Sequence, residues 1–420
     1  MLKVVGGQRL SGIVEISGSK NASLPIIAAS LLLEKVTLHN VPRIGDIFSL
    51  LDIIRSLGVV VDFTGNTLTM DMTHISLDHM NRGLMNKIRA SILLLAPLLY
   101  RFGTVDIPFP GGCNIGKRPI DEHLNGLREI GYESKDTEES IHLSGKLQSG
   151  EKNLYAGFAV TATENLITAN ILRPGRTRIH LAAIEPHVVN LVDFLKNLGA
   201  NITINYDHTI DIIGVEKIAS TGEFFIVHDY IESGTFIVLG ALASQEYIDI
   251  HHACIQGLTS FLVKCREVGV RFEDRGDDIL RVYRSEHLQA IKSFQTNVFP
   301  GFPTDLQSVF CILLSQAEGV SRVQEIMFEG RLNFLVELEK MKGHPALMNP
   351  HEALIFGPTH LRGATVSSWD LRAGVAMIIA GLIATGDTYI TNVEYIERGY
   401  EDIIGKIGRL GVKIEHVKSA

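Results

Sequence analysis

The sequence has few cysteines, one tryptophan and no excess of positive charge. Its four cysteines, in 420 residues, form neither a disulfide framework nor a CxxC metal pair, which suits a reducing cytosol. Net charge is −8, which argues against a broad basic surface for nucleic acid. The apolar runs are shorter than the roughly 20 residues of a membrane span, and no signal-peptide pattern opens the chain. We expect a cytoplasmic protein without nucleic-acid or membrane partners; the sequence leaves its oligomeric state open.

A helix-end pattern repeats along the chain. An apolar residue, a glycine and then an alternating strand recur at Gly58, Gly131, Gly199, Gly269 and Gly411, with a weaker copy at Gly343. Helices commonly end with one left-handed residue, which favours glycine. The spacing predicts six repeats of about 70 residues.

Each repeat also holds an apolar helix preceded by polar residues. Asp229, Asp305 and Asp370 suit capping or first-turn positions, whereas the cations Lys20 and Arg372 do not, nor does Arg89. A cation at a helix N-terminus makes sense when both bind one anion. Six such helices suggest two domains of three repeats, with the helix N-termini at an interdomain cleft. The expected apolar helices are 22–33, 90–99, 166–172, 235–242, 306–314 and 373–383.

The segment 110–119 contains three glycines and two prolines and is therefore predicted to be a loop. Cys113 lies in it, followed by Lys117 and Arg118. Neighbouring cations favour the thiolate, so Cys113 is a candidate reactive thiol. From these residues alone, a glycine-rich turn with an incidental cysteine stays equally open.

Eight motifs, in order along the whole chain, resemble the enolpyruvyl transferase family, in the branch that acts on UDP-N-acetylglucosamine. The resemblance implies two inside-out α/β domains, residues 20–228 and residues 1–19 with 229–420, with the active site in the cleft between them. The motifs are Ser17–Ala22, Lys87–Ser91, Pro110–Asp121, Gly234–Phe236, Phe302–Asp305, Phe328–Arg331, Asp370–Ala373 and Arg398–Glu401.

The resemblance also implies the reaction. The enolpyruvyl group of phosphoenolpyruvate moves to the 3-hydroxyl of UDP-N-acetylglucosamine by addition and elimination, and phosphate is released. This is the first committed step of peptidoglycan synthesis, and so serves cell wall biogenesis, cell shape, the cell cycle and cell division. Neither a cofactor nor a metal is implied. Cys113 would be the thiol that fosfomycin alkylates.

The residue roles are carried over from matching motif positions. Cys113 would be the proton donor and could form a covalent adduct with phosphoenolpyruvate; Asp305 would be the base. Lys20 and Arg398 complete the catalytic set. Phosphoenolpyruvate would bind Lys20, Asn21, Arg118, Arg372 and Arg398. UDP-N-acetylglucosamine would contact Arg89, Arg118, Pro119, Ile120, Asp121, Glu122, Asp305 and Met327. The chain departs from the family pattern at Ala159, Thr161, Tyr230, Phe299 and Gly330.

Three other functions compete with this one. 5-Enolpyruvylshikimate-3-phosphate synthase shares the fold but not the cysteine loop. A non-catalytic paralogue that binds nucleotide sugar would not need both Cys113 and Asp305. An RNA-end-processing enzyme conflicts with the acidic net charge.

The run 251–254 looks like half of a metal site. The sequence places no second ligand pair, however, and we interpret the run as a surface turn.

Overall fold

The computed structural model describes residues 1–109, 111, 115–116, 118–136 and 140–417. The chain forms two compact units. Unit 1 consists of Met1–Ser17, Asn114–Lys117 and His228–Ala420, and unit 2 of Gly18–Cys113 and Arg118–Val227. The chain leaves unit 1 after Ser17 and returns at His228, beside the boundaries predicted at 19–20 and 228–229.

Unit 2 contains three sheets among the described residues. The first has the order β13 (Thr221–Phe225), β3 (Lys35–His39), β5 (Thr67–Asp71) and β4 (Val60–Thr64). The second has the order β11 (Asn201–Ile204), β12 (Ile210–Ile213), β10 (Arg176–His180) and β9 (Lys152–Tyr155). The third has β6 (Thr104–Pro108), β8 (Ser140–Gly145) and β7 (Tyr132–Asp136).

Unit 1 likewise contains three sheets in the described part of the chain. One has the order β21 (Thr365–Ser367), β22 (Thr388–Thr391), β1 (Leu2–Val4) and β23 (Ile414–His416), so both ends of the chain lie in one sheet. Another has β15 (Arg271–Gly276), β16 (Ile279–Tyr283), β14 (Ser244–His251) and β2 (Leu10–Glu15). The last has β17 (Ser293–Gln295), β18 (Gly319–Gln324), β20 (Glu352–Gly357) and β19 (His344–Asn349).

The four-stranded sheets share one pairing pattern. In each, a parallel pair of strands is extended by two antiparallel strands: β9 and β10 are parallel, for example, whereas β10 pairs antiparallel with β12 and β12 with β11. The same pattern recurs in the sheets of β2, β13, β17 and β21. The recurrence confirms the predicted repeat architecture.

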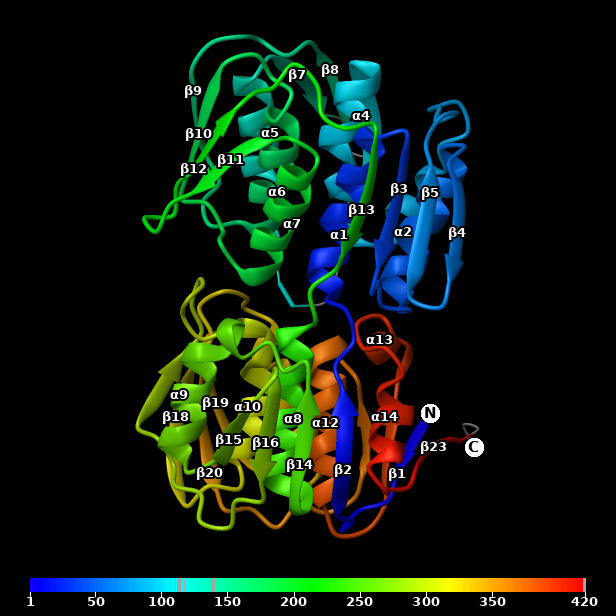
Figure 1. Cartoon of the computed structure of the whole chain (residues 1–420). Coiled ribbons are helices and arrows are strands. Elements are labelled where there is room, and N and C mark those ends of the chain that lie inside the picture. Colours follow the sequence, from blue (N-terminus) through cyan, green and yellow to red (C-terminus); the bar gives the residue numbers. More distant parts are fainter. Residues whose placement is uncertain (110, 112–114, 117, 137–139, 418–420) are drawn as a thin grey trace. The chain divides into compact units, whose positions relative to one another are not determined.

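Buried helices occupy the interior of each unit (Figure 1). In unit 1 the three central helices contact one another, and in unit 2 their counterparts do the same. Because these helices are apolar on nearly every side, they are stable only when all their faces are shielded from water. The expected inside-out α/β packing is thus confirmed. The central helices are α8 (Tyr230–Ala243), α10 (Gln307–Leu314) and α12 (Leu371–Ile383), and α1 (Lys20–Ala29), η2 (Arg89–Leu94) with α4 (Leu95–Phe102), and α6 (Val160–Asn170).

Six further helices precede the helix-end signatures. Five of their terminal glycines have φ between 85° and 116°, in the left-handed region that the sequence predicts for them. The sixth signature is shifted: Lys342, not Gly343, is left-handed, with φ 65°. The six helices are α2 (Gly45–Ser56), α5 (Asp121–Glu129), α7 (Pro186–Asn197), α9 (Thr259–Val268), α11 (Leu335–Lys340) and α14 (Ile403–Arg409).

The remaining helices are short. They are α3 (Arg82–Met85), α13 (Glu394–Glu397), and the 3₁₀ turns η1 (Ser30–Leu32), η3 (Ile255–Leu258), η4 (Thr304–Leu306) and η5 (Arg331–Phe334). Among the helices of the described residues, none has the length and hydropathy needed to cross a membrane.

Candidate active site

Asp305 is the centre of a charge cluster in unit 1. It lies in η4, which has no side-chain cap. Its Oδ1 accepts a hydrogen bond from Arg331 Nη2 at 3.0 Å, and its Oδ2 accepts one from Arg372 Nη2 at 2.8 Å. Both guanidinium groups are buried, whereas the Asp305 side chain is 25% exposed. Asp305 is therefore the counter-ion of two buried cations rather than a helix cap.

Arg372 is fixed by the start of α12. Asp370 caps this helix as predicted, accepting hydrogen bonds from the backbone N–H groups of Arg372 and Ala373 at 2.7 and 3.0 Å. The guanidinium lies over the Tyr400 ring, 5.1 Å from its centroid, and Tyr400 shares a hydrogen bond of 2.9 Å with the Thr235 hydroxyl. Arg372 Nη1 is buried and, among the described residues, has no hydrogen-bond partner. An unsatisfied buried donor is costly, so this atom suits an anionic ligand.

Glu325 connects two predicted site segments. Its buried carboxylate accepts hydrogen bonds from the Thr296 hydroxyl and the Met327 N–H, both at 2.8 Å, and from the Thr304 hydroxyl at 2.9 Å. The Glu325 carboxylate thus positions Met327, a predicted contact of the nucleotide sugar, and Thr304, the residue before Asp305. Glu325 is not among the site residues predicted from the sequence. The one sequence feature that could have indicated Glu325 is its position directly after a strand of alternating residues.

Ile115 and Gly116, in the cysteine loop, belong to unit 1. The Gly330 N–H donates to the Ile115 carbonyl at 2.8 Å. Gly116 has φ 134°, and a Cβ there would lie 2.3 Å from Glu329 Oε2, so this position requires glycine. Cys113 and Lys117 lie outside the described residues, and their predicted roles are therefore not tested. Arg398 ends α13 as its C-cap residue.

In unit 2, Lys20 begins α1 directly after its cap. Ser19 accepts a hydrogen bond from the Ala22 N–H. The Lys20 ammonium forms an ion pair of 2.8 Å with Asp46, and both side chains are largely buried. Asp46 lies in the first turn of α2. Nothing in the sequence pairs these two residues, because capping alone explains an acid at that position. Asn21, the next predicted contact, is half-buried.

Two predicted anion-binding arginines lie near each other. Arg89 Nη2 donates to the Pro119 carbonyl at 3.0 Å, and Arg89 Nε is buried without a hydrogen-bond partner among the described residues. Burial, and then the neighbouring charge of Arg118, lower the pKa of Arg89 to about 10. Such like charges are favourable where an anion lies between or beside them. The structure thus brings together Arg89, Arg118 and Pro119.

The start of α5 adjoins the segment after β9. Ile120 precedes α5, and Asp121 and Glu122 form its first turn. A Cβ placed at Gly157 would lie 3.3 Å from Glu122 Cγ. The predicted nucleotide-sugar contacts 118–122 thus lie beside the segment 157–161.

His123 links three elements that carry these contacts. Asn165 Nδ2 donates to His123 Nδ1 at 2.8 Å and to the Ile92 carbonyl at 2.8 Å. The His123 proton is therefore on Nε2, which donates to the Thr161 hydroxyl at 3.1 Å. Burial, and then Arg89, lower the His123 pKa to about 3, so the ring is neutral. Thr161, one of the departures from the family pattern, thus accepts a hydrogen bond from a fixed neighbour.

Glu164 makes stability depend on pH. It is buried in α6, its Oε1 has no hydrogen-bond partner in the described chain, and burial followed by the charge of Glu185 raises its pKa well above the usual value. The folded state then holds this proton where the unfolded state, with a pKa near 4.3, has released it, so stability falls as pH rises. We expect Glu164→Gln to melt higher than the unmodified protein at pH 8, and the difference to shrink towards pH 4. Melting curves at both pH values measure this. An equal difference at the two would contradict it.

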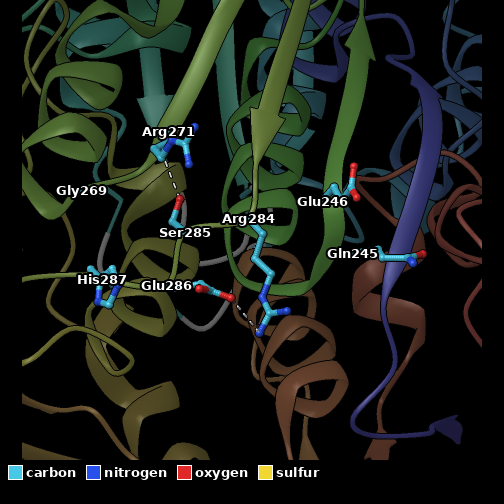
Figure 2. Close-up of a pocket in the computed structure, with 8 residues that line it drawn as sticks. All are labelled: Gln245, Glu246, Gly269, Arg271, Arg284, Ser285, Glu286 and His287. Atoms are coloured by element: carbon cyan, nitrogen blue, oxygen red, sulfur yellow. Dashed lines mark hydrogen bonds and ion pairs between the residues drawn. The ribbon is translucent and has the colours of Figure 1, made fainter.

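A pocket of about 390 Å³ lies elsewhere in unit 1 (Figure 2). Its charged residues are of both signs, and Arg284 faces Glu286 at 3.7 Å. None of the predicted site residues lines it. It is bordered by Gln245, Glu246, Gly269, Arg271, Arg284, Ser285, Glu286 and His287. This pocket is therefore not the candidate active site. The charged clusters described above are Asp305 with Arg331 and Arg372 in unit 1, and Arg89 with Arg118 in unit 2.

Comparison with known proteins identifies the family of the chain. Residues 4–407 match the family model described as EPSP synthase (3-phosphoshikimate 1-carboxyvinyltransferase). The chain is 39% identical to a UDP-N-acetylglucosamine 1-carboxyvinyltransferase of Finegoldia magna, covering 100% of this chain and 99% of that protein. It is 40% identical to the protein of that name from Thermotoga maritima, covering 99% of each chain.

Solved structures share the fold. The crystal structure of the enolpyruvyl transferase NikO from Streptomyces tendae has a TM-score of 0.90 and 25% identity, and the match covers 100% of this chain and 99% of that one. An EPSP synthase of Acinetobacter baumannii has a TM-score of 0.72 at 16% identity, covering 99% of each chain, and shows the fold alone. The full-length family match and the relatives near 40% identity lead to one conclusion: this chain is a transferase that belongs to the EPSP synthase family of enolpyruvyl transferases.

Proposed function

We propose that the protein transfers the enolpyruvyl group of phosphoenolpyruvate to the 3-hydroxyl of UDP-N-acetylglucosamine and releases phosphate. The observation that carries the proposal is the end-to-end match to relatives named for that activity, at 39–40% identity. The reaction would serve peptidoglycan synthesis, in the cytoplasm, and neither a metal nor a cofactor takes part in it.

Asp305 would act as the base. The sugar 3-oxygen attacks C2 of phosphoenolpyruvate while its proton passes to the Asp305 carboxylate. Two guanidinium groups beside that carboxylate favour its charged form, which is the form a base needs. Arg372 serves in two ways: it pairs with Asp305, and its buried Nη1 has a hydrogen left to donate to a substrate oxygen.

Cys113 would carry out the other proton transfer, which takes place at C3 of phosphoenolpyruvate. It protonates C3 during addition and becomes a thiolate; as phosphate leaves C2 during elimination, C3 returns a proton to this thiolate. Its thiol would also form the covalent adduct with phosphoenolpyruvate and react with fosfomycin.

Several cations would bind the substrates. Lys20, Arg118 and Arg398 match the charge of the phosphate and carboxylate groups of phosphoenolpyruvate, and Asn21 adds a neutral hydrogen-bonding group. The proximity of Arg89 and Arg118 supports an anion at that place in unit 2. The nucleotide sugar would contact Arg89, Asp305, Met327 and the segment 118–122.

Phosphate release from phosphoenolpyruvate tests the proposal. Two reactions are run, one with UDP-N-acetylglucosamine and one with shikimate 3-phosphate. We expect release in the first only, with the enolpyruvyl sugar nucleotide as the second product by mass spectrometry. Release only with shikimate 3-phosphate would assign the protein to the sister activity. Release in neither would favour a binding protein without catalysis.

A further inference from the structure

Two histidines and an aspartate meet at one edge of unit 1, outside the candidate active site. His228 is the first residue of unit 1 after the chain leaves unit 2. His252 follows β14, and Asp278 lies in the turn between β15 and β16. Each offers one ligand atom, a ring nitrogen or a carboxylate oxygen, and these atoms all lie within 4.8 Å of one another. We propose that His228, His252 and Asp278 form a binding site for a divalent transition-metal ion such as Zn²⁺.

The sheet explains why these residues meet. β14 pairs with β2 on one side and with β16 on the other, which places His251 opposite Glu15 and opposite Ile279. His252 directly follows β14, and Asp278 directly precedes β16. The two residues therefore lie at the same edge of the sheet. The chain after β2 continues to Ser17, whose carbonyl accepts a hydrogen bond from the Asp229 N–H at 2.9 Å. That bond brings His228 to the same edge.

The backbone holds the ligands in position. His252 and Asp278 have φ of 59° and 57°, a conformation that bulky side chains seldom adopt and that costs free energy. Asp278 is further fixed because its Oδ1 accepts the Cys254 N–H at 2.9 Å and its carbonyl accepts the Ala253 N–H at 3.0 Å. Its second carboxylate oxygen can still bind an ion.

The ligand chemistry selects the class of ion. Two imidazole nitrogens with one carboxylate suit zinc and its first-row neighbours, whereas magnesium and calcium prefer oxygen ligands alone. The His228 side chain is partly buried and lies near the ammonium group of Lys406. The positive charge of Lys406 is offset by its ion pair with Glu232. Glu15, 3.5 Å from His252 Nε2, adds a negative charge at the site.

Binding of a metal ion requires one of the two imidazole rings to rotate. The two imidazoles now stack, with centroids 4.2 Å apart and planes 4° from parallel, and a metal lies in the plane of each ring that binds it. His252, whose side chain is 50% exposed, has the space to turn out of the stack. Tetrahedral coordination, with bonds near 2.1 Å, brings the ligand atoms to about 3.4 Å from one another. The fourth position would be taken by water.

Zinc titration of the full chain tests the site. Calorimetry is run on Cys113→Ser protein, so that the predicted thiol does not compete, and on the same protein with His252→Ala, Asp278→Asn or His251→Ala. Asp278→Asn keeps the hydrogen-bond acceptor and the left-handed turn but loses the charge. His251→Ala removes the adjacent histidine, which pairs with Glu15 at 2.9 Å and does not belong to the cluster.

We expect one zinc ion per chain, bound at least about tenfold more weakly after either ligand substitution and with unchanged affinity in His251→Ala. Zinc should also raise the melting temperature of the His251→Ala control but not of the ligand variants. Far-ultraviolet circular dichroism verifies that each variant is folded. Equal affinity and stoichiometry in the control and in His252→Ala, or no binding at millimolar zinc, would overturn the proposal.

Discussion

Replacing Asp305 with Asn is expected to lower the turnover of phosphate release by about 10²–10⁴-fold, the usual contribution of a positioned base. The amide occupies nearly the same volume but accepts no proton. If Asp305 acts only by positioning Arg372, the main change will instead be a higher KM for phosphoenolpyruvate. The measurement is steady-state phosphate release with both substrates varied, which separates kcat from KM.

Folding must be followed in the same variant. Asp305 neutralises two guanidinium groups that are nearly inaccessible to solvent, and removing one member of a buried ion pair commonly costs several kcal/mol. Melting curves therefore establish that the assayed protein is folded. Asp277→Asn, an exposed carboxylate in the β15–β16 turn, is the matched control and should keep full activity. Turnover of Asp305→Asn within about threefold of that control would rule out general-base catalysis by this residue.

Lys406→Met is expected to reduce the free energy of unfolding of unit 1 by about 3–5 kcal/mol. Lys406 Nζ contacts Glu232 Oε1 at 2.5 Å and donates to the Ser17 hydroxyl at 2.7 Å, while Glu232 Oε2 accepts the Ser17 N–H at 2.9 Å. Both side chains are buried. Without Lys406, the carboxylate of Glu232 stays in the interior with no counter-ion. Urea unfolding measures the loss, and the only tryptophan of the chain, Trp369, reports on unit 1.

A second substitution distinguishes the lost charge pair from lost packing. Glu232→Gln in the Lys406→Met protein removes the unpaired charge but keeps an acceptor for Ser17, so most of the stability should return. Burial raises the pKa of Glu232, and losing Lys406 raises it further. A raised folded-state pKa means that stability falls as pH increases, so the single variant should recover towards pH 4. A loss below about 1 kcal/mol, the range of exposed pairs, would contradict the prediction.

The features that depend on residues close together along the chain were predictable from the sequence. Glycine is favoured where a helix ends in a left-handed residue, and five of the six signatures have that conformation. Asp229 and Asp370 cap α8 and α12 because a short acidic side chain reaches the first N–H groups of its own helix. The apolar composition of the central helices predicted their burial. The sixth signature differs because Lys342 takes the left-handed position one residue earlier.

The charge partners within each unit were decided by the tertiary structure. Asp305 is the first-turn acid of η4 that the sequence predicts, but its ion pairs with Arg331 and Arg372, which come from other elements, were not predictable. Lys20 with Asp46 and Glu325 with Thr304 are likewise joined by packing. Local preferences act over a few residues of chain, whereas an ion pair depends on where distant segments fold. The repeats, the helix ends and the family thus follow from local sequence patterns, whereas the packing of distant segments sets which polar groups meet.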